Sequence, residues 1–432
     1  MKRLLVIANL HHASPRIPAL LHYLSDLGWN STVITPELGD EPQSVLGFPN
    51  EFLDKVEIIV SPYRGDIFWP LRKLLNIFGF SKESSYTEQL KEEVIGGRSW
   101  IDYAMLAYQT FLAFPDTEWP WHHSAFKTAS KAIDENSYDL ILSSSPFPTV
   151  HRVASKLKRK YQIPWVADFR DPWSQSHNYT LPKLRHKLDR WLELKTLSNA
   201  NRIITVSLGF AEKLKSLHNI QVDVIRNGFQ PVSKRPEVEF PKKFTIGYTG
   251  TIYSGKQDPS KIILALKRLL DKGEIVAEHI ILEFYGRYDS DLQNIIDKHD
   301  LSNVVVQKGS IPRAEIRKYQ MSVHLLLLLQ WEATEERGIF PLKFYEYLDS
   351  RRPILVTGGD AKSELADLLD ETKTGYLAID VDEIMAVLKK AYAEFTSTGM
   401  IKYSGDVSCV TKYSYLSAAE KLNKTLESIL DS

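Results

Sequence analysis

The chain has 432 residues, which is too long for one ordinary hydrophobic core and fits two domains of roughly 200 residues each. Its 54 basic residues balance its 54 acidic residues, so composition gives no electrostatic reason to expect a nucleic acid partner. The single cysteine, Cys409, excludes an internal disulfide and a cysteine-based metal site, and a cytoplasmic location is expected.

Short runs rich in aliphatic and β-branched residues alternate with helical patterns through the first half of the chain. This alternation predicts an α/β fold in which βα units build a parallel sheet. The first run is expected to be a strand rather than a signal peptide, because two histidines and Arg16 interrupt the apolar sequence. The predicted strands cover residues 4–8, 32–35, 56–60, 140–143, 165–168 and 203–206.

One segment, residues 61–125, breaks this alternation and is rich in aromatic residues and helical patterns. It could lie on a membrane surface, which would give the protein a peripheral contact with the inner face of the plasma membrane. The alternative is a helix pair that covers the first sheet, and this is favoured because apolar helical stripes usually face a core. The basic run at residues 156–160 is expected to be a solvated helix face.

A second series of βα units follows Gly228, with predicted strands at 244–248, 280–285, 304–306, 323–328, 354–356 and 376–379. Residues 230–236 contain two prolines and few apolar residues, so they are predicted to be a linker. We therefore expect two doubly wound, Rossmann-like domains, at residues 1–228 and 229–400, facing a central cleft. Residues 401–432 are predicted to include a C-terminal helix that crosses back to the first domain.

The stretch from Arg337 to Leu348, with Arg352–Val356 after it, predicts a loop, a helix with proline in its first turn, and a buried strand. The start of such a helix offers unpaired backbone N–H groups and a positive dipole end to an anion. Lys343 adds a positive charge, and Glu346 lies one turn further along the helix. The pattern is suited to binding a nucleotide diphosphate.

The same stretch resembles the donor-binding helix of the retaining glycosyltransferases of family 4, which have the two-domain GT-B fold. In that family two glutamates stand eight positions apart, and the second holds the ribose of the nucleotide. Glu346 matches the second glutamate, whereas Gly338 occupies the place of the first. The resemblance implies that Gly338, Phe340, Pro341, Lys343 and Glu346 contribute to donor binding.

Residues 247–256 resemble the strand, glycine turn and phosphate clamp of the same family. Gly250 lies in the turn and Lys256 matches the clamp lysine, while Thr251 stands where the family has an arginine. The missing charge would come from Arg287 or Lys343, and two cations would stabilise a leaving nucleoside diphosphate. The turn at residues 309–312 resembles the loop that receives the base, so Ile311 is expected to pack against the base.

Residues 164–173 resemble a bacterial branch of these enzymes that builds surface polysaccharides. The resemblance places Asp168, Arg170 and Asp171 at the catalytic centre, with Arg170 where many relatives have a histidine. Asp168 could orient a sugar hydroxyl or act as general base, whereas an arginine cannot accept a proton at neutral pH. The alternative is an ion-pair network that joins the three residues and rigidifies the loop. Arg16 is expected on the acceptor side.

No metal or other cofactor is expected, because the two Asp-x-Asp sequences at 289–291 and 380–382 stand where an aspartate would cap a helix. The resemblance thus implies a retaining, metal-independent glycosyltransferase. It would move a sugar from a nucleotide diphosphate donor to a saccharide or lipid-linked acceptor in surface polysaccharide synthesis. Two alternatives are a nucleotide-sugar epimerase of the same fold and a non-catalytic binding subunit that retains the fold.

Overall fold

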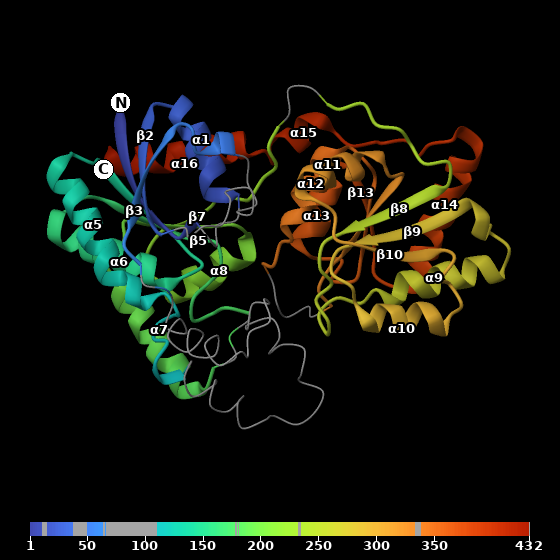
Figure 1. Cartoon of the computed structure of the whole chain (residues 1–432), viewed down its shortest axis with the longest axis horizontal. Coiled ribbons are helices and arrows are strands. Elements are labelled where there is room, and N and C mark those ends of the chain that lie inside the picture. Colours follow the sequence, from blue (N-terminus) through green and yellow to red (C-terminus); the bar gives the residue numbers. More distant parts are fainter. Residues whose placement is uncertain are drawn as a thin grey trace, which may run out of the picture. The chain divides into compact units, whose positions relative to one another are not determined.

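The computed structural model describes residues 1–10, 15–37, 50–63, 65, 110–177, 179, 181–231, 235–332 and 338–431. The chain divides into two compact units (Figure 1). The first comprises residues 1–206, 210–225 and 419–432, and the second comprises residues 207–209 and 226–418. Most of the segment 61–125, and residues 232–234 of the predicted linker, lie outside the described residues.

A parallel sheet forms the centre of the first unit, with the strand order β3-β2-β1-β4-β5-β6-β7. Each of the six strands predicted in this part of the chain is present, and β7 is an addition at the edge. The strands are β1 (Lys2–Ala8), β2 (Trp29–Pro36), β3 (Val56–Ser61), β4 (Leu140–Ser144), β5 (Trp165–Phe169), β6 (Arg202–Thr205) and β7 (Val222–Val224).

Helices cover this sheet and complete its core. Alternate strand residues such as Leu5, Ile141 and Ala167 pack with apolar residues of α5, α6 and α8 in one buried cluster. The helices of the unit are α1 (Arg16–Asp26), α5 (His122–Glu135), α6 (Pro148–Tyr161), α7 (Lys183–Leu197), α8 (Leu208–Leu217) and α16 (Tyr415–Leu430), with 3-10 turns η3 (Asn50–Phe52) and η4 (Trp119–Trp121).

The helix α16 comes from the far end of the chain, and its residues from Ala419 onward belong to the first unit. Two polar contacts join it to that sheet. The indole nitrogen of Trp29 donates a hydrogen bond to Asn423 at 2.7 Å, and Lys2 forms a 2.7 Å ion pair with Glu427. The first and last segments of the chain therefore pack within the same unit.

The second unit has a six-stranded parallel sheet with the order β10-β9-β8-β11-β12-β13. The two parallel sheets with intervening helices confirm the predicted α/β fold class. The strands are β8 (Phe244–Thr249), β9 (Ile280–Tyr285), β10 (Val305–Gly309), β11 (Leu325–Leu329), β12 (Ile354–Thr357) and β13 (Gly375–Ala378).

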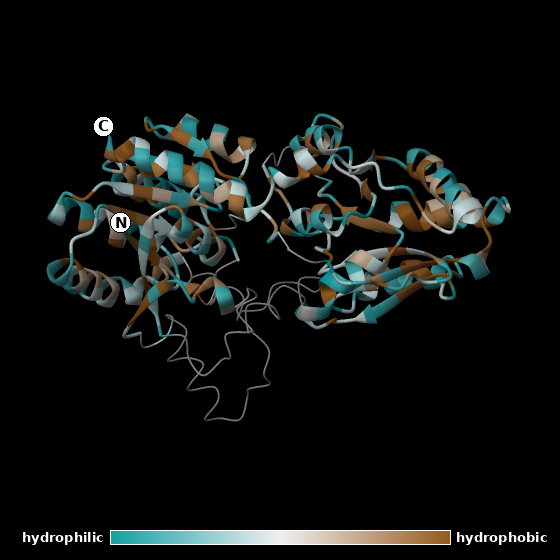
Figure 2. Ribbon diagram, turned by 90° about the horizontal axis from the view of Figure 1, so that it is seen from above, coloured by the Kyte–Doolittle hydropathy of each residue, from teal (hydrophilic) through white to brown (hydrophobic). Residues whose placement is uncertain are grey.

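Strand β11 shows why the second sheet is buried on both faces. Leu325, Leu327 and Leu329 belong to one core cluster, and Leu326 and Leu328 belong to another. Because side chains of a strand alternate between faces, a continuous leucine run requires helices on both sides. Figure 2 shows the resulting hydrophobic strands.

The helices of the second unit are α9 (Ser260–Asp271), α10 (Ser290–Lys298), α11 (Arg313–Ser322), α12 (Leu342–Ser350), α13 (Glu364–Thr372), α14 (Val381–Thr398) and α15 (Val407–Thr411), with the 3-10 turn η5 (Ala277–His279).

Candidate functional site

The carboxyl ends of β8, β9 and β11 meet in the middle of the second sheet. Ligands of doubly wound proteins bind at this edge, where the order of strands reverses. The chain leaves β8 at Thr249, and α12 begins after the loop that follows β11. Most of the predicted donor residues lie on the loops and helix starts at this edge.

Gly250 makes a close turn directly after β8. Its φ is +114°, and its N–H donates a 2.7 Å hydrogen bond to the carbonyl of Tyr285 at the end of β9. A Cβ added at Gly286 would lie 2.3 Å from the carbonyl oxygen of Gly250. The two glycines therefore allow the loops after β8 and β9 to approach more closely than residues with side chains would permit.

Lys343 extends from the first turn of α12 to the end of β8. Its Nζ donates a 2.8 Å hydrogen bond to the hydroxyl of Tyr248 and lies 4.1 Å from the centre of that ring. A Cβ added at Gly250 would stand 2.8 Å from the same Nζ. Burial lowers the pKa of Lys343 to about 7, against the opposing effect of the carboxylate of Glu346. An anion that binds nearby would raise this pKa, so the amine form of Lys343 would then take up a proton.

Glu346 lies one turn further along α12 and is held by side chains from α11. Its Oε2 accepts a 3.3 Å hydrogen bond from Gln320, and its Oε1 lies 3.4 Å from a guanidinium nitrogen of Arg313. The buried amide of Gln320 also donates a 3.0 Å hydrogen bond to the hydroxyl of Thr249. Gln320 thus links the carboxylate of Glu346 to Thr249 at the end of β8 and fixes its orientation. The side chain of Glu346 remains 30% exposed.

The start of α12 has the features of an anion site. Pro341 is the N-cap residue and provides no side-chain cap, and the first turn contains no acidic residue. Phe340 packs edge-to-face against Phe344 at 5.5 Å and so fixes the entry of the chain into the helix. Gly338 has a φ of +97°, a conformation that a glutamate would adopt only with strain. The glycine is therefore suited to the backbone at this position.

Lys256 lies on the same edge, in the loop between β8 and α9, but its ammonium group faces an aromatic ring. The Nζ is 4.1 Å from the centre of the Trp331 ring. Lys256 also lines a cavity of about 320 Å³ between this loop and the start of α10. Asp289 lines the cavity too, and its carboxylate caps α10 by accepting a 2.8 Å hydrogen bond from Leu292 N–H.

The remaining predicted donor residues lie on neighbouring loops of the same unit. The carbonyl of Thr251 accepts a 2.9 Å hydrogen bond from the hydroxyl of Tyr248. The same hydroxyl accepts the hydrogen bond from Lys343, so it links the Thr251 backbone to that lysine. Arg287 is exposed after β9. Ile311 is partly buried in the loop between β10 and α11. The contacts described above connect Gly250, Lys343 and Glu346 with their surroundings, and the donor-binding roles of all these residues stay predictions.

In the first unit, Asp168 lies near the carboxyl end of β5 and forms a buried ion pair with Arg16 at the start of α1. The two side chains are 0% and 1% exposed, and the guanidinium contacts both carboxylate oxygens, at 3.0 and 3.2 Å. The hydroxyl of Ser144, on the adjacent strand, donates a further 2.7 Å hydrogen bond to Asp168. This geometry makes Asp168 an anchor for the buried guanidinium of Arg16, and the acceptor-side role of Arg16 stays a prediction.

Arg170 forms its own ion pair with Asp171, at 3.2 Å. The side chains are 22% and 41% exposed, so this pair is far more accessible to solvent than the Arg16–Asp168 pair. The amide of Arg170 donates a 3.0 Å hydrogen bond to the hydroxyl of Ser145. The sequence suggested one network through Asp168, Arg170 and Asp171, and the structure adds Arg16 as the partner of Asp168. The catalytic roles of these residues stay predictions.

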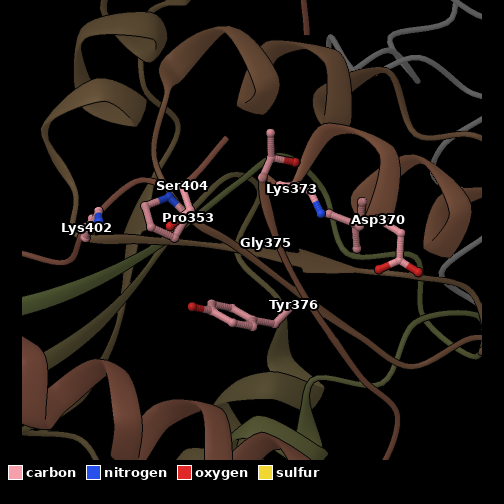
Figure 3. A pocket seen from close by; sticks show the side chains of 9 residues that line it. Pro353, Asp370, Lys373, Gly375, Tyr376, Lys402 and Ser404 are labelled. Carbon is pink, nitrogen blue, oxygen red and sulfur yellow. The ribbon is translucent and has the colours of Figure 1, made fainter. Parts of the chain in front are cut away.

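The second unit has another cavity, of about 270 Å³, at the edge of the sheet where the amino ends of the strands lie (Figure 3). Pro353 precedes β12 and Tyr376 lies at the start of β13, so both belong to the amino ends of their strands. Lys373 and Lys402 also line the cavity and are both exposed. Because doubly wound folds bind their ligands at the carboxyl ends of strands, this cavity is not part of the candidate site.

Sequence reasoning missed two side chains that orient the site. Tyr248 lies in β8 within the 247–256 motif but was given no role, and Gln320 in α11 belongs to no motif. Tyr248 stands two residues before Gly250, and that proximity could have indicated it. Gln320 gave no such signal, because only the packing of α11 beside α12 brings it to Glu346.

Residues 102–231 match the family model described as Glycosyltransferase Family 4. No match was found among curated protein sequences. Among solved structures, the sucrose-phosphate synthase of Thermosynechococcus elongatus has 13% sequence identity and a TM-score of 0.58, with 100% of both chains covered. HepE from Anabaena, solved in complex with UDP, has 12% identity and a TM-score of 0.58, over 99% of this chain and 100% of that one.

The lipopolysaccharide outer core galactosyltransferase WaaB, solved in its apo form, is also similar. It has 12% sequence identity and a TM-score of 0.56, and the match covers 99% of each chain. At such identities the likeness concerns the fold, which is that of the GT-B proteins. It spans both units, whereas the family model matches part of the chain that lies mainly in the first.

Proposed function

We propose that the chain is a glycosyltransferase that transfers a sugar from a nucleoside diphosphate donor with retention of configuration, which its family 4 match over residues 102–231 and its likeness to GT-B structures support. The acceptor would be a saccharide or a lipid-linked saccharide in surface polysaccharide synthesis. The observation that carries this proposal is the convergence of Gly250, Lys343 and Glu346 at one edge of the second sheet.

The diphosphate would bind at the start of α12. A helix N-terminus leaves its first N–H groups without intrahelical partners, and its dipole favours an anion. Here no side chain caps the helix, and Lys343 adds a cation within the first turn. The absence of a side chain at Gly250 leaves room for the Nζ of Lys343, which a Cβ would approach to 2.8 Å. These features support a phosphate group close to both residues.

The ribose would bind to Glu346. A carboxylate has about four lone-pair positions, and Gln320 and Arg313 engage one oxygen each. The remaining positions can accept hydrogen bonds from vicinal hydroxyl groups. The link from Glu346 through Gln320 to Thr249 holds the carboxylate in a fixed orientation, which lowers the entropic cost of binding. The UDP bound to HepE supports a nucleotide as the ligand of this fold.

In the reaction, the bond from the anomeric carbon to the leaving phosphate oxygen breaks, and a bond from that carbon to the acceptor hydroxyl oxygen forms on the same face. The acceptor oxygen attacks directly, so no enzyme nucleophile is required, and the hydroxyl proton passes to the leaving phosphate, which acts as the base. Negative charge grows on the diphosphate as its bond breaks, and Lys343, Lys256 or Arg287 would stabilise that charge. Such a reaction is metal-independent, and EDTA should leave the transfer rate unchanged.

The acceptor class rests on the resemblance of residues 164–173 to surface-polysaccharide enzymes, with which the fold likeness to WaaB agrees. The direct test is product formation from a panel of nucleotide sugars with saccharide and lipid-linked saccharide acceptors. Transfer with the donor's anomeric configuration retained is expected, and an inverted product would overturn the retaining mechanism.

Incubation with the nucleotide sugar alone separates the transferase from the two alternatives. Slow hydrolysis without isomerisation supports the transferase, whereas an isomerised sugar would indicate an epimerase. Nucleotide binding without transfer, hydrolysis or isomerisation across the panel would indicate a binding subunit.

A further inference from the structure

Helix α7 of the first unit exposes an apolar stripe. Leu184, Leu188, Trp191 and Leu194 are 68%, 46%, 56% and 39% exposed. Their spacing of four, three and three residues places them along one side of the helix. Single exposed apolar residues are common, but a contiguous row that includes a tryptophan usually marks a binding surface.

The inner side of α7 carries buried charged groups beside its core leucines. Three charged residues, Arg185, Asp189 and Glu193, are almost fully buried, as are Leu192 and Leu197. Arg185 pairs with Asp189 at 2.8 Å, and Glu193 accepts a 2.9 Å hydrogen bond from Ser174 N–H and lies 3.1 Å from His218. An ordinary surface helix turns its apolar residues inward. In α7, by contrast, four apolar residues stay on the outer side while three charged residues are buried.

The outer side of α7 is also strongly basic. Lys183, Lys187, Arg190 and Lys195 are all exposed, whereas both acidic residues of the helix, Asp189 and Glu193, are buried. The exposed side thus presents four positive charges and no negative charge. One of these cations, Lys195, lies 4.9 Å from the centre of the Trp191 ring. Basic and aromatic groups are therefore interleaved on the surface.

The apolar surface continues onto the segment beside the start of α7. Arg185 donates hydrogen bonds of 2.9, 2.9 and 2.8 Å to the carbonyl groups of Thr110, Ala113 and Pro115, which fixes this segment against the helix. Phe111 and Leu112, within the same segment, are 74% and 53% exposed. We call the exposed residues Phe111, Leu112, Leu184, Leu188, Trp191 and Leu194, with the four basic residues of α7, the α7 face.

We propose that the α7 face docks on the surface of an anionic phospholipid bilayer. Tryptophan and leucine side chains would enter the boundary between headgroups and acyl chains, and the lysine and arginine side chains would contact anionic headgroups. The charge of the face is complementary to such a surface, and its lack of acidic groups argues against a basic or neutral protein partner. The docking goes beyond sugar transfer and does not require a bound donor.

The test measures co-sedimentation of the full chain, without nucleotide, on vesicles of phosphatidylcholine with or without phosphatidylglycerol. We expect binding to the anionic vesicles that is at least tenfold stronger than binding to neutral vesicles, because each cation near the surface adds to the attraction. Failure of the wild-type protein to bind anionic vesicles would overturn the proposal.

Two double variants locate the contact. Lys187→Glu with Arg190→Glu should reduce binding to anionic vesicles at least tenfold. The matched control, Lys272→Glu with Lys298→Glu, makes the same change of net charge on exposed residues of the second unit and should retain most binding. Leu188→Ser with Trp191→Ser tests the apolar contribution and should also reduce binding. Equal losses in the charge variant and its control would overturn the assignment to α7, and circular dichroism checks that each variant is folded.

A labelling experiment tests whether the α7 face is open in the absence of vesicles. The only native cysteine is Cys409, so Leu188→Cys in a Cys409→Ser background carries one thiol. An environment-sensitive maleimide should react rapidly with this thiol, and its emission should shift to the blue when anionic vesicles are added. Slow labelling in solution, or sedimentation as a dimer, would show that another part of the protein or a second copy covers the face, and would overturn the proposal.

Discussion

The Nζ of Lys343 lies 2.8 Å from the hydroxyl of Tyr248, which joins the first turn of α12 to the end of β8. The contact places an ammonium group with a pKa of about 7 where the turn at Gly250 has no side chain. Burial lowers that pKa, so an approaching anion would raise it again. The site can therefore bind a diphosphate and a proton together.

We expect proton uptake when a nucleoside diphosphate binds near pH 8. Lys343 is ionised below about pH 7 in the free protein, so affinity should be highest there and fall as pH rises through 7. Calorimetry in two buffers with different ionisation enthalpies measures the uptake directly. Lys343→Met should abolish most of it, whereas Lys256→Met should not. Absence of uptake in the wild-type protein would contradict the placement of a phosphate beside Lys343.

Gly250→Ala should weaken nucleotide binding by about tenfold, equivalent to about 1.4 kcal/mol. The added Cβ would lie 2.8 Å from the Nζ of Lys343 and must displace it. Gly273→Ala is the control, because Gly273 also has a positive φ, of +64°, but a Cβ there meets no atom within 4 Å. Both variants should lose stability through backbone strain. Equal nucleotide affinities in the two variants would show that the turn does not face the ligand.

Asp168→Asn should destabilise the first unit by about 3 kcal/mol, because it leaves Arg16 as a buried cation without its carboxylate partner. Asp171→Asn removes the carboxylate of a more exposed pair and should cost less than about 1 kcal/mol. Urea unfolding measures both changes. If Asp168→Asn unfolds normally but transfers sugar about 10²- to 10⁴-fold more slowly, Asp168 acts as the general base instead.

The positions of the strands along the chain could be predicted because each one is a short apolar run between helical patterns. Residues 244–248 and 280–285 were placed within a residue of β8 and β9. The edge strand β7 was missed, since Val222–Val224 is only three residues long and includes the polar residue Asp223. Short edge strands bury little, and their apolar signal is correspondingly weak.

The local parts of the site could also be predicted, whereas its long-range contacts could not. Lys343 and Glu346 follow from the helix that begins after Pro341. The pairing of Arg16 with Asp168 joins residues 152 positions apart, and sequence spacing carries no information about such a contact. The burial of charged residues in α7 was hidden for the same reason, because Glu193 is stabilised by the distant partners Ser174 and His218.

The central claim is that the second unit binds a nucleoside diphosphate through the edge that contains Glu346. The most direct measurement is calorimetric titration of the full chain with UDP, GDP, dTDP and ADP, followed by titration of Glu346→Gln with whichever nucleotide binds. The substitution removes a charged acceptor of ribose hydroxyls and should weaken binding by about 1.5 to 3 kcal/mol, or roughly 10- to 150-fold. Failure of all four nucleotides to bind the wild-type protein, or equal affinity in the variant, would contradict the account.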